Sequence, residues 1–271
     1  MRFFESVSRL LRANKYMEIC AYLIQNCLKI NSQGGGSFGK SAKEMHYYFT
    51  TVAENYVSQL GAEAFSQKVV LELGTGFSRS GMLHLIKEYD VKQAFCFDKY
   101  NCLDPIEEEI IKHNNLESYM NRLTYIEGEY EEILEHIDVN SVDTIVSNAV
   151  LEFVVDLDEL IKVLSTIVKN ESVSYHKVDL KCHNKFKTSG ELYFHTFSNR
   201  LWNLMGNRVG QLSRRLPESY KKTFKKYSFS CSANESFFSN ECMLHAKEYL
   251  KSEDIENFKV SDIEFFLKKD A

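Results

Sequence analysis

Two apolar runs of this chain end in residues that could bind a ligand. The first ends in an acid and a glycine turn, and the second ends in another acid. The first run, starting at Val69, ends in Glu72-Leu73-Gly74-Thr75-Gly76, and the second ends on Asp98. Glycine has no Cβ, so it can turn the backbone with a positive φ and approach a ligand closely. A carboxylate offers two oxygens to neighbouring ribose hydroxyls. The pattern predicts a nucleoside-containing cofactor at one edge of an open α/β sheet.

The acid ahead of the turn indicates the charge of that cofactor. Glu72 would repel the pyrophosphate of a dinucleotide, and it would attract a cation. S-adenosylmethionine carries an ammonium and a sulfonium, so we expect this cofactor, with S-adenosylhomocysteine as its product. An NAD-dependent oxidoreductase is the alternative, but its glycine spacing requires a third glycine where this chain has Arg79.

The segment Val70–Gly76 resembles the first motif of class I S-adenosylmethionine-dependent methyltransferases. The similarity continues through Asp98 and through Val142–Glu152, and it covers roughly Lys68 to Leu180. It implies a Rossmann-like α/β fold, with a mainly parallel seven-stranded sheet whose last strand is antiparallel. It also implies a methyl transfer reaction.

The same resemblance assigns cofactor contacts by position. The methionine part would be held by the acid and the turn, which comprise Glu72, Gly74, Thr75 and Gly76. The ribose would be held by Asp98, and the surroundings of the sulfonium would include Ser147 or Asn148. For the adenine amine the sequence offers Glu127 or Glu129, and it does not decide between them.

Three polar residues near the end of the fifth predicted strand are candidate catalytic residues: His176, Asp179 and His183. A histidine that an acid orients is a reasonable general base at neutral pH. Strand alternation puts His176 and Asp179 on opposite faces, so His176 is also interpretable as a core residue. Because one strand does not bring all three together, we predict no metal site. Glu152 follows Asn148 by one helical turn and can face the same cleft.

Strands and helices alternate from Lys68 onward, which indicates parallel strands joined by right-handed crossovers. The predicted strands are 69–73, 94–98, 123–127, 144–147, 173–180, 227–231 and 262–267. The predicted helices are 3–30 (one or two), 42–60, 81–88, 105–113, 131–137, 157–168 and 242–250.

Two regions fall outside this alternation. Residues 1–60 form a predicted N-terminal helical segment with a glycine-rich lid at 34–39, ahead of a methyltransferase-like domain at 61–271. Residues 183–226 form an aromatic and basic insert that serves as a cap after the fifth strand. Its arginines, including Arg214 and Arg215, either grip an anionic acceptor or are solvated. The N-terminal amphipathic helix packs on the body, pairs two subunits in a homodimer, or touches a membrane surface.

Composition excludes some partners. The net charge of -5 argues against nucleic-acid binding, which requires many phosphates to be neutralised. No apolar run is long enough to insert stably into a membrane. The 7 cysteines are scattered and form no CxxC pair, which indicates reduced thiols and a cytoplasmic protein. We expect a small-molecule or glycan-type acceptor, and the non-enzymatic alternative is a catalytically inactive methyltransferase-like binding module.

Overall fold

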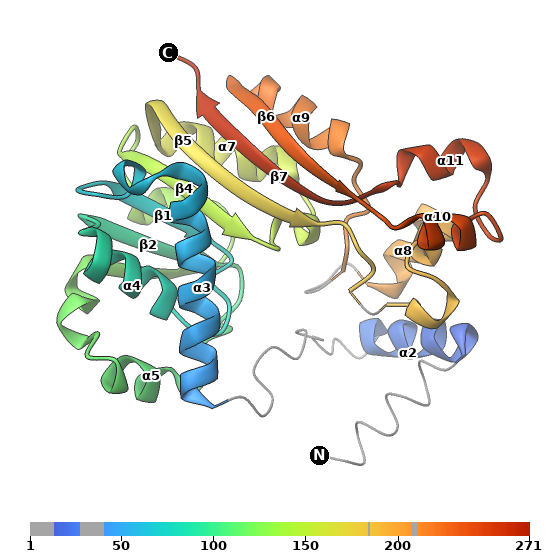
Figure 1. Ribbon diagram of the computed structural model, residues 1–271, viewed down its shortest axis with the longest axis horizontal. Coiled ribbons are helices and arrows are strands. Elements are labelled where there is room, and N and C mark those ends of the chain that lie inside the picture. The colour runs from blue at the N-terminus through green and yellow to red at the C-terminus, as the bar shows by residue number, and fades with distance from the viewer. Residues whose placement is uncertain (1–13, 28–40, 184, 207–210) are drawn as a thin grey trace.

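The computed structural model of the 271-residue chain describes residues 14–27, 41–183, 185–206 and 211–271 (Figure 1). These ranges contain a seven-stranded sheet with the order β3-β2-β1-β4-β5-β7-β6. The strands are β1 (Val69–Leu73), β2 (Gln93–Asp98), β3 (Leu123–Glu127), β4 (Val142–Asn148), β5 (Val168–Asp179), β6 (Phe229–Phe237) and β7 (Val260–Lys269).

The first five strands are parallel, and β7 lies antiparallel between β5 and β6. This arrangement confirms the predicted α/β fold with a mainly parallel seven-stranded sheet and an antiparallel last strand. Parallel strands end at the same edge of the sheet. The carboxyl ends of β1 to β5 therefore bring together residues that lie far apart in the sequence.

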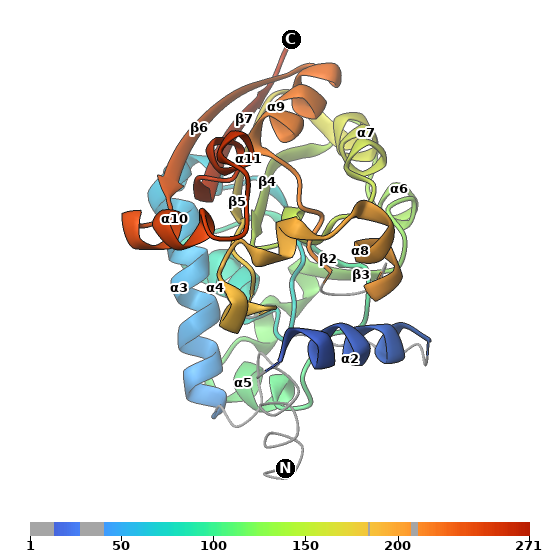
Figure 2. The same ribbon diagram turned by 90° about the vertical axis from the view of Figure 1, so that its right-hand side faces the viewer.

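Helices cover both faces of the sheet (Figures 1 and 2). One layer contains α3 (Ala42–Leu60), α4 (Ser80–Tyr89) and α5 (Glu107–His113), and the other contains α6 (Glu132–His136), α7 (Leu157–Ile167) and α9 (Pro217–Lys226). The remaining helices are α2 (Lys15–Cys27), α8 (Asn199–Met205), α10 (Asn240–Ala246) and α11 (Ser252–Asn257). None of the helices described is both long and apolar enough to cross a membrane.

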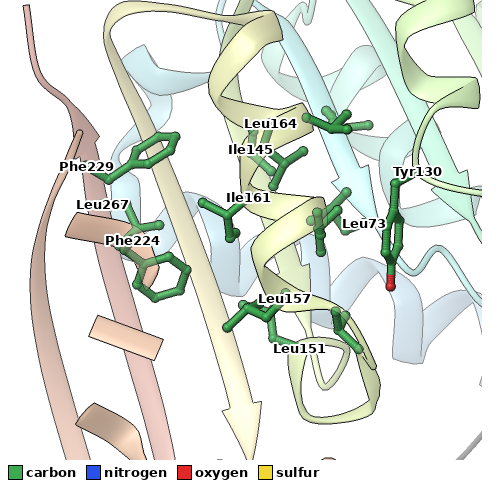
Figure 3. Packing of buried hydrophobic residues seen from close by; sticks show 14 of the residues in the cluster. Leu73, Tyr130, Ile145, Leu151, Leu157, Ile161, Leu164, Phe224, Phe229 and Leu267 are labelled. Carbon is green, nitrogen blue, oxygen red and sulfur yellow. The ribbon is translucent and has the colours of Figure 1, made fainter. Parts of the chain in front are cut away.

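Helix α7 shows how the sequence builds one of these layers. Asp156 caps the helix, because its carboxylate accepts a hydrogen bond from the Glu159 N–H at 3.0 Å. Apolar residues recur every three or four positions and point at the sheet, as Leu157, Ile161 and Leu164 do in Figure 3. Each buried leucine or isoleucine contributes about 1.5–3 kcal/mol to folding, so this stripe fixes α7 on the sheet.

Helix α3 packs closely on the opposite layer. Its cap is a reciprocal pair, in which the Ser41 hydroxyl accepts from the Glu44 N–H and the Glu44 carboxylate accepts from the Ser41 N–H. A Cβ at Gly81 of α4 would lie 2.8 Å from the Phe49 carbonyl oxygen of α3. The glycine therefore allows the two helices to touch, and the contact holds α3 over the edge where β1 ends.

The observed elements differ from the predicted ones mainly in the C-terminal part. Strand β6 continues to Phe237, and α10 and α11 replace a single helix at 242–250. The alternation in β6 is weak because this edge strand is largely exposed, so its residues are mostly polar. Residues 217–226 of the predicted insert form α9, which packs on the sheet beside α7.

The N-terminal helix is present in part. Helix α2 lies within the predicted helical segment 3–30 and packs beside α8 (Figure 2). The Asn26 amide donates a hydrogen bond to the Leu204 carbonyl oxygen of α8 at 2.9 Å. Residues 3–13 and 28–30 of the predicted segment and the glycine-rich lid at 34–39 lie outside the described residues, as does Arg208, another arginine of the insert.

Candidate active site

The glycine turn follows β1 directly. Gly74 has a φ of 69°, and a Cβ there would lie 2.3 Å from a methyl carbon of Val150. Only glycine avoids both the strained φ and this contact. The N–H groups of Gly74 and Thr75 donate to the Phe97 carbonyl oxygen of β2, at 2.7 and 3.3 Å. The loop after β1 is thereby held against the end of β2.

Gly76 forms the open part of this turn. Its φ is also 69°, yet a Cβ there would meet nothing closer than the Gly74 carbonyl oxygen at 4.0 Å. The Gly76 N–H donates to Oδ2 of Asp98 at 3.0 Å, and the Tyr100 N–H donates to Oδ1 of the same residue at 3.2 Å. The turn and the predicted ribose-binding carboxylate are therefore in direct contact, beside open space. Burial raises the pKa of Asp98, and these backbone donors oppose that shift.

Glu72 is a buried carboxyl group beneath the turn. Its side chain accepts a hydrogen bond from the Tyr56 hydroxyl of α3, at a distance of 3.4 Å. Burial raises the pKa of Glu72 to about 7, and the nearby charge of Asp98 acts in the same direction. This carboxyl group therefore titrates near neutral pH. A cationic partner beside it would favour its charged form.

Tyr56 is a site residue that the sequence did not reveal. It is fully buried on α3, and its ring packs edge-on against Tyr175 of β5 at 6.1 Å between centroids. A single aromatic residue on an amphipathic helix is indistinguishable from ordinary core. Its partner Glu72 becomes its neighbour only when α3 packs on the sheet, so no local sequence signal marks it.

The end of β3 carries the two acids considered for adenine. Glu127 is paired in register with Asp98 and is exposed at the edge of the sheet. Glu129 instead forms an ion pair with Lys99. The Gly128 N–H between them donates to the Asp98 carbonyl oxygen at 3.2 Å. The structure thus places Glu127 beside the ribose-binding candidate and engages Glu129 elsewhere.

Arg79 stands where a dinucleotide-binding turn has its third glycine. Its guanidinium donates to Glu107 of α5, with the closest contact at 2.7 Å, and its backbone N–H donates to the same carboxylate at 2.6 Å. Glu107 is buried, so the pair is bidentate and largely shielded from water. This ion pair fixes the segment between the glycine turn and α4, and no local sequence signal predicts it.

His176 lies away from the other catalytic candidates. Its ring stacks on Phe224 of α9, and its Nδ1 contacts the Ser147 hydroxyl at 2.8 Å. The side chain is 1% exposed, and burial lowers its pKa to about 3. His176 therefore stays neutral inside the α7–α9 layer. The structure does not bring it together with Asp179 and His183.

Strand alternation separates the candidates in the same way. Val146 of β4 and Tyr175 of β5 pack under α3, whereas Ile145 and Val178 pack under α7. With a period of two, Asn148 and Asp179 therefore lie on the α3 face, as do Glu72, Asp98 and Glu127. Glu72, Asp98, Glu127 and Asn148 therefore share one face at the carboxyl edge with Asp179. Ser147, the alternative to Asn148, lies on the other face with His176.

Asp179, His183 and Glu152 do come together. Nε2 of His183 lies 3.7 Å from Oδ2 of Asp179 and 3.6 Å from Oε1 of Glu152. Glu152 belongs to a short 3₁₀ helix, Leu151–Phe153, that follows β4. Burial raises the pKa of Glu152 well above its usual range, and the charge of Asp179 adds to the shift. These three groups form one polar cluster, which includes the predicted catalytic residues Asp179 and His183.

Arg214 and Arg215 of the insert bind backbone carbonyl groups of the protein. One guanidinium nitrogen of Arg214 donates to the Phe197 carbonyl oxygen at 2.7 Å. Arg215 donates to the carbonyl oxygens of Val154 and Val155. Both side chains therefore anchor the cap, and their hydrogen-bonding groups are directed at the protein backbone. Gripping an anionic acceptor, one of the two alternatives from the sequence, has no support in these contacts.

The cap is an aromatic cluster that α2 helps to close. Its buried members are Cys182, Phe186, Phe194, Trp202, Met205 and Leu212. Glu18 of α2 accepts a hydrogen bond from the Phe186 N–H at 2.9 Å, and Tyr22 packs on the Phe186 ring. A small pocket of about 20 Å³ lies between this cap and β7, and its lining includes Glu152, His195 and Ser213. That volume holds about one water molecule.

No group of three or more histidine, cysteine, aspartate or glutamate side chains is arranged to hold an ion in the described ranges.

Comparisons with known proteins agree on the fold. No family model and no curated protein sequence matches the chain. Phosphoethanolamine N-methyltransferase 2 of Haemonchus contortus, crystallised with S-adenosylmethionine, is 14% identical with a TM-score of 0.50, and the match covers 76% of this chain and 50% of that one. A second structure of that enzyme, with phosphomonomethylethanolamine and S-adenosylhomocysteine, is 15% identical with a TM-score of 0.51, and its coverage is also 76% and 50%.

A third similar structure matches over nearly its whole length. It is a candidate sarcosine dimethylglycine methyltransferase from Galdieria sulphuraria, 14% identical with a TM-score of 0.50, covering 89% of this chain and 92% of that one. The present chain thus spans about half the length of the Haemonchus enzyme and most of the Galdieria protein. With its strand order and antiparallel β7, the chain has the fold of class I S-adenosylmethionine-dependent methyltransferases.

Proposed function

We propose that this chain transfers a methyl group from S-adenosylmethionine to a small-molecule or glycan-type acceptor. The observation that carries the proposal is the buried Glu72 carboxyl group beneath a glycine turn whose Gly76 N–H binds Asp98. The Haemonchus enzyme, which shares the fold, was crystallised with this cofactor and with its product. That shared fold supports the same cofactor at the corresponding edge of this sheet.

The residues present fit such a cofactor. The space beside Gly76 is open to a ligand, and Glu72 provides a negative charge for an ammonium group. Asp98 can accept both ribose hydroxyls, and Glu127 is the nearer acid for adenine. When bound, S-adenosylmethionine supplies a methyl group on a positively charged sulfur, with the sulfide as a good leaving group. The protein mainly has to hold the acceptor in line with it.

The acceptor side of this proposal is the cluster of Asp179, His183 and Glu152, together with Asn148 at the end of β4. These groups can orient a polar acceptor and receive its proton. His176 is omitted from the chemistry, because it is buried on the other face of the sheet.

The test is a calorimetric titration of the full chain with S-adenosylhomocysteine and, separately, with NAD. We expect binding of the homocysteine product alone. The change Asp98→Asn should weaken that binding by about ten- to hundredfold, because hydrogen bonds to a charged group contribute about 1.5–3 kcal/mol each.

Asp158→Asn is the matched control for this titration. Asp158 is half exposed and pairs with Lys226 on the surface, far along the chain from the turn. The affinity of Asp158→Asn for S-adenosylhomocysteine should equal that of the unchanged protein. Equal affinities of the unchanged protein, Asp98→Asn and Asp158→Asn would contradict the assignment of Asp98. Binding of NAD alone would contradict the proposed cofactor.

A further inference from the structure

The ring of His183 is held by oxygen atoms on one side. Its Nε2 lies 3.3 Å from the Asp179 backbone carbonyl oxygen, in addition to the carboxyl oxygens of Asp179 and Glu152. A backbone carbonyl can only accept a hydrogen bond. In the neutral ring the proton therefore belongs on Nε2, and the lone pair belongs on Nδ1.

The second ring nitrogen of His183, Nδ1, is available to accept a proton. Among the residues that the structure describes, Nδ1 of His183 has no hydrogen-bond partner, and the side chain is 26% exposed. The Phe153 ring meets the imidazole edge-on, with 5.0 Å between ring centroids, and so restricts its rotation. The imidazole is therefore partly exposed, its rotation is restricted, and its Nδ1 is not engaged by a described group.

Glu152 is an unusual neighbour for this ring. Its side chain is 2% exposed, and neither carboxyl oxygen makes a hydrogen bond of good geometry within the described ranges, although the backbone N–H groups of Glu152 and Asp179 act to lower its pKa. Its backbone is fixed, because the Ser213 N–H donates to the Glu152 carbonyl oxygen at 2.7 Å. Leaving a buried polar group without a partner costs about 1–3 kcal/mol, so this position is poorly explained by fold stability.

We propose that His183 is the general base on the acceptor side, acting through Nδ1, and that Glu152 is a positioning residue that keeps the proton on Nε2. This inference rests on the methyl transfer proposed above. The acceptor O–H bond breaks and its proton passes to Nδ1, while the oxygen forms a bond to the methyl carbon. The electron pair of the broken carbon–sulfur bond stays on sulfur, so charge and atoms balance.

A base of this kind matters most for a hydroxyl acceptor. A neutral amine attacks with its own lone pair and can lose its proton afterwards, whereas a hydroxyl is a poor nucleophile until its proton is removed. Correctly placed general bases contribute about 10²- to 10⁴-fold to such rates. The arrangement around His183 therefore favours transfer to oxygen.

The experiment reads the histidine tautomer directly and needs no acceptor. The full chain, labelled with ¹⁵N in its 8 histidines, is examined by two-dimensional NMR that distinguishes protonated from unprotonated ring nitrogens. The His183 signals are assigned by their loss in His183→Gln. We expect the neutral ring to carry its proton on Nε2, and a ring with the proton mainly on Nδ1 would overturn the proposal.

The role of Glu152 is tested with two matched leucine variants. In Glu152→Leu the tautomer ratio of His183 should shift toward Nδ1–H by roughly fivefold, because the carboxyl oxygen 3.6 Å from Nε2 no longer favours a proton on that nitrogen. The control is Glu248→Leu, because His245 Nε2 also lies 3.6 Å from the Glu248 carboxylate, but on the exposed surface. In Glu248→Leu, water replaces the carboxylate, so the tautomer ratio of His245 should stay the same. An unchanged His183 ratio in Glu152→Leu would overturn the positioning role.

Titration of the same samples with S-adenosylhomocysteine separates the two proposals. Binding together with an Nδ1-protonated His183 would overturn the base assignment and leave the methyltransferase proposal standing. Absence of binding by the folded protein would overturn both, because the inferred base has no reaction to serve.

Discussion

At the scale of single residues, the cofactor side is built around carboxyl groups whose burial changes their chemistry. Glu72 is the clearest case, since its pKa is raised to about 7 by burial. A buried carboxylate is costly until a cation neutralises it, which is the property expected of a group that binds an ammonium. The residue that suits the ligand is therefore one that destabilises the empty protein.

This conflict predicts a pH-dependent effect of Glu72→Gln. The unfolded carboxyl loses its proton near pH 4.5 and the folded one near 7, so the folded state binds more protons between these values. Stability contributed by this group therefore falls as pH rises through that window. The glutamine variant should be more stable than the unchanged protein at pH 8, by up to about 3 kcal/mol, and nearly equal at pH 5.

Urea unfolding at the two pH values measures this difference. Glu117→Gln, at an exposed position, is the control and should show no difference at either pH. The same Glu72→Gln variant should lose affinity for S-adenosylhomocysteine at pH 8. A stability gain that is equal at pH 5 and pH 8 would contradict a raised pKa for this carboxyl group.

Residue types alone identified much of this site, and their limits have a physical cause. Glu72, Gly74, Gly76 and Asp98 lie in continuous segments at strand ends, so their spacing predicts that they meet at the carboxyl edge of the sheet. Tyr56 and Arg79 act through partners that only tertiary packing brings near. His176 is the opposite case. Its residue type suggested a catalytic role, but its side chain lies on the face of β5 that packs against α9.

At the scale of elements, the parallel strands and the presence of a cap were predictable, whereas the contacts that hold the cap were not. Strands β1 to β4 are apolar runs bounded by turns, because both of their faces are covered by helices. The cap is held by side-chain contacts to backbone groups, such as Arg215 to the Val154 carbonyl oxygen and Glu18 to the Phe186 N–H. Such contacts leave no periodicity in the sequence.

Helix α2 should depend on Glu18 for its docking to the cap. Glu18 is 2% exposed and accepts hydrogen bonds from the Phe186 N–H at 2.9 Å and from the Tyr22 hydroxyl at 3.1 Å. In Glu18→Ala the Phe186 amide loses its acceptor, at a cost of about 1–3 kcal/mol. We expect the hydrogen exchange of that amide to become faster by roughly tenfold or more.

Cys20→Ala is the control for α2, because Cys20 lies on the exposed side of the same helix. It should leave the exchange of the Phe186 amide unchanged. Equal exchange in Glu18→Ala and Cys20→Ala would show that α2 is held on the cap by its apolar contacts alone.

At the scale of the whole molecule, the sheet order explains why distant residues meet. The order β3-β2-β1-β4-β5 places the ends of β1, β2 and β3 on one side of the carboxyl edge, where Glu72, Asp98 and Glu127 lie. The ends of β4 and β5 bring Asn148 and Asp179 to the other side. A cofactor lying along the edge would reach from the first group toward the second, with the cap beyond it (Figure 2).

A crystal structure of the full chain with S-adenosylhomocysteine tests this account most directly. The account predicts the ribose hydroxyls on the Asp98 carboxylate, the ammonium beside Glu72 and the sulfur facing the cluster of Asp179, His183 and Glu152. Product bound elsewhere, or bound with its sulfur turned away from that cluster, would contradict it.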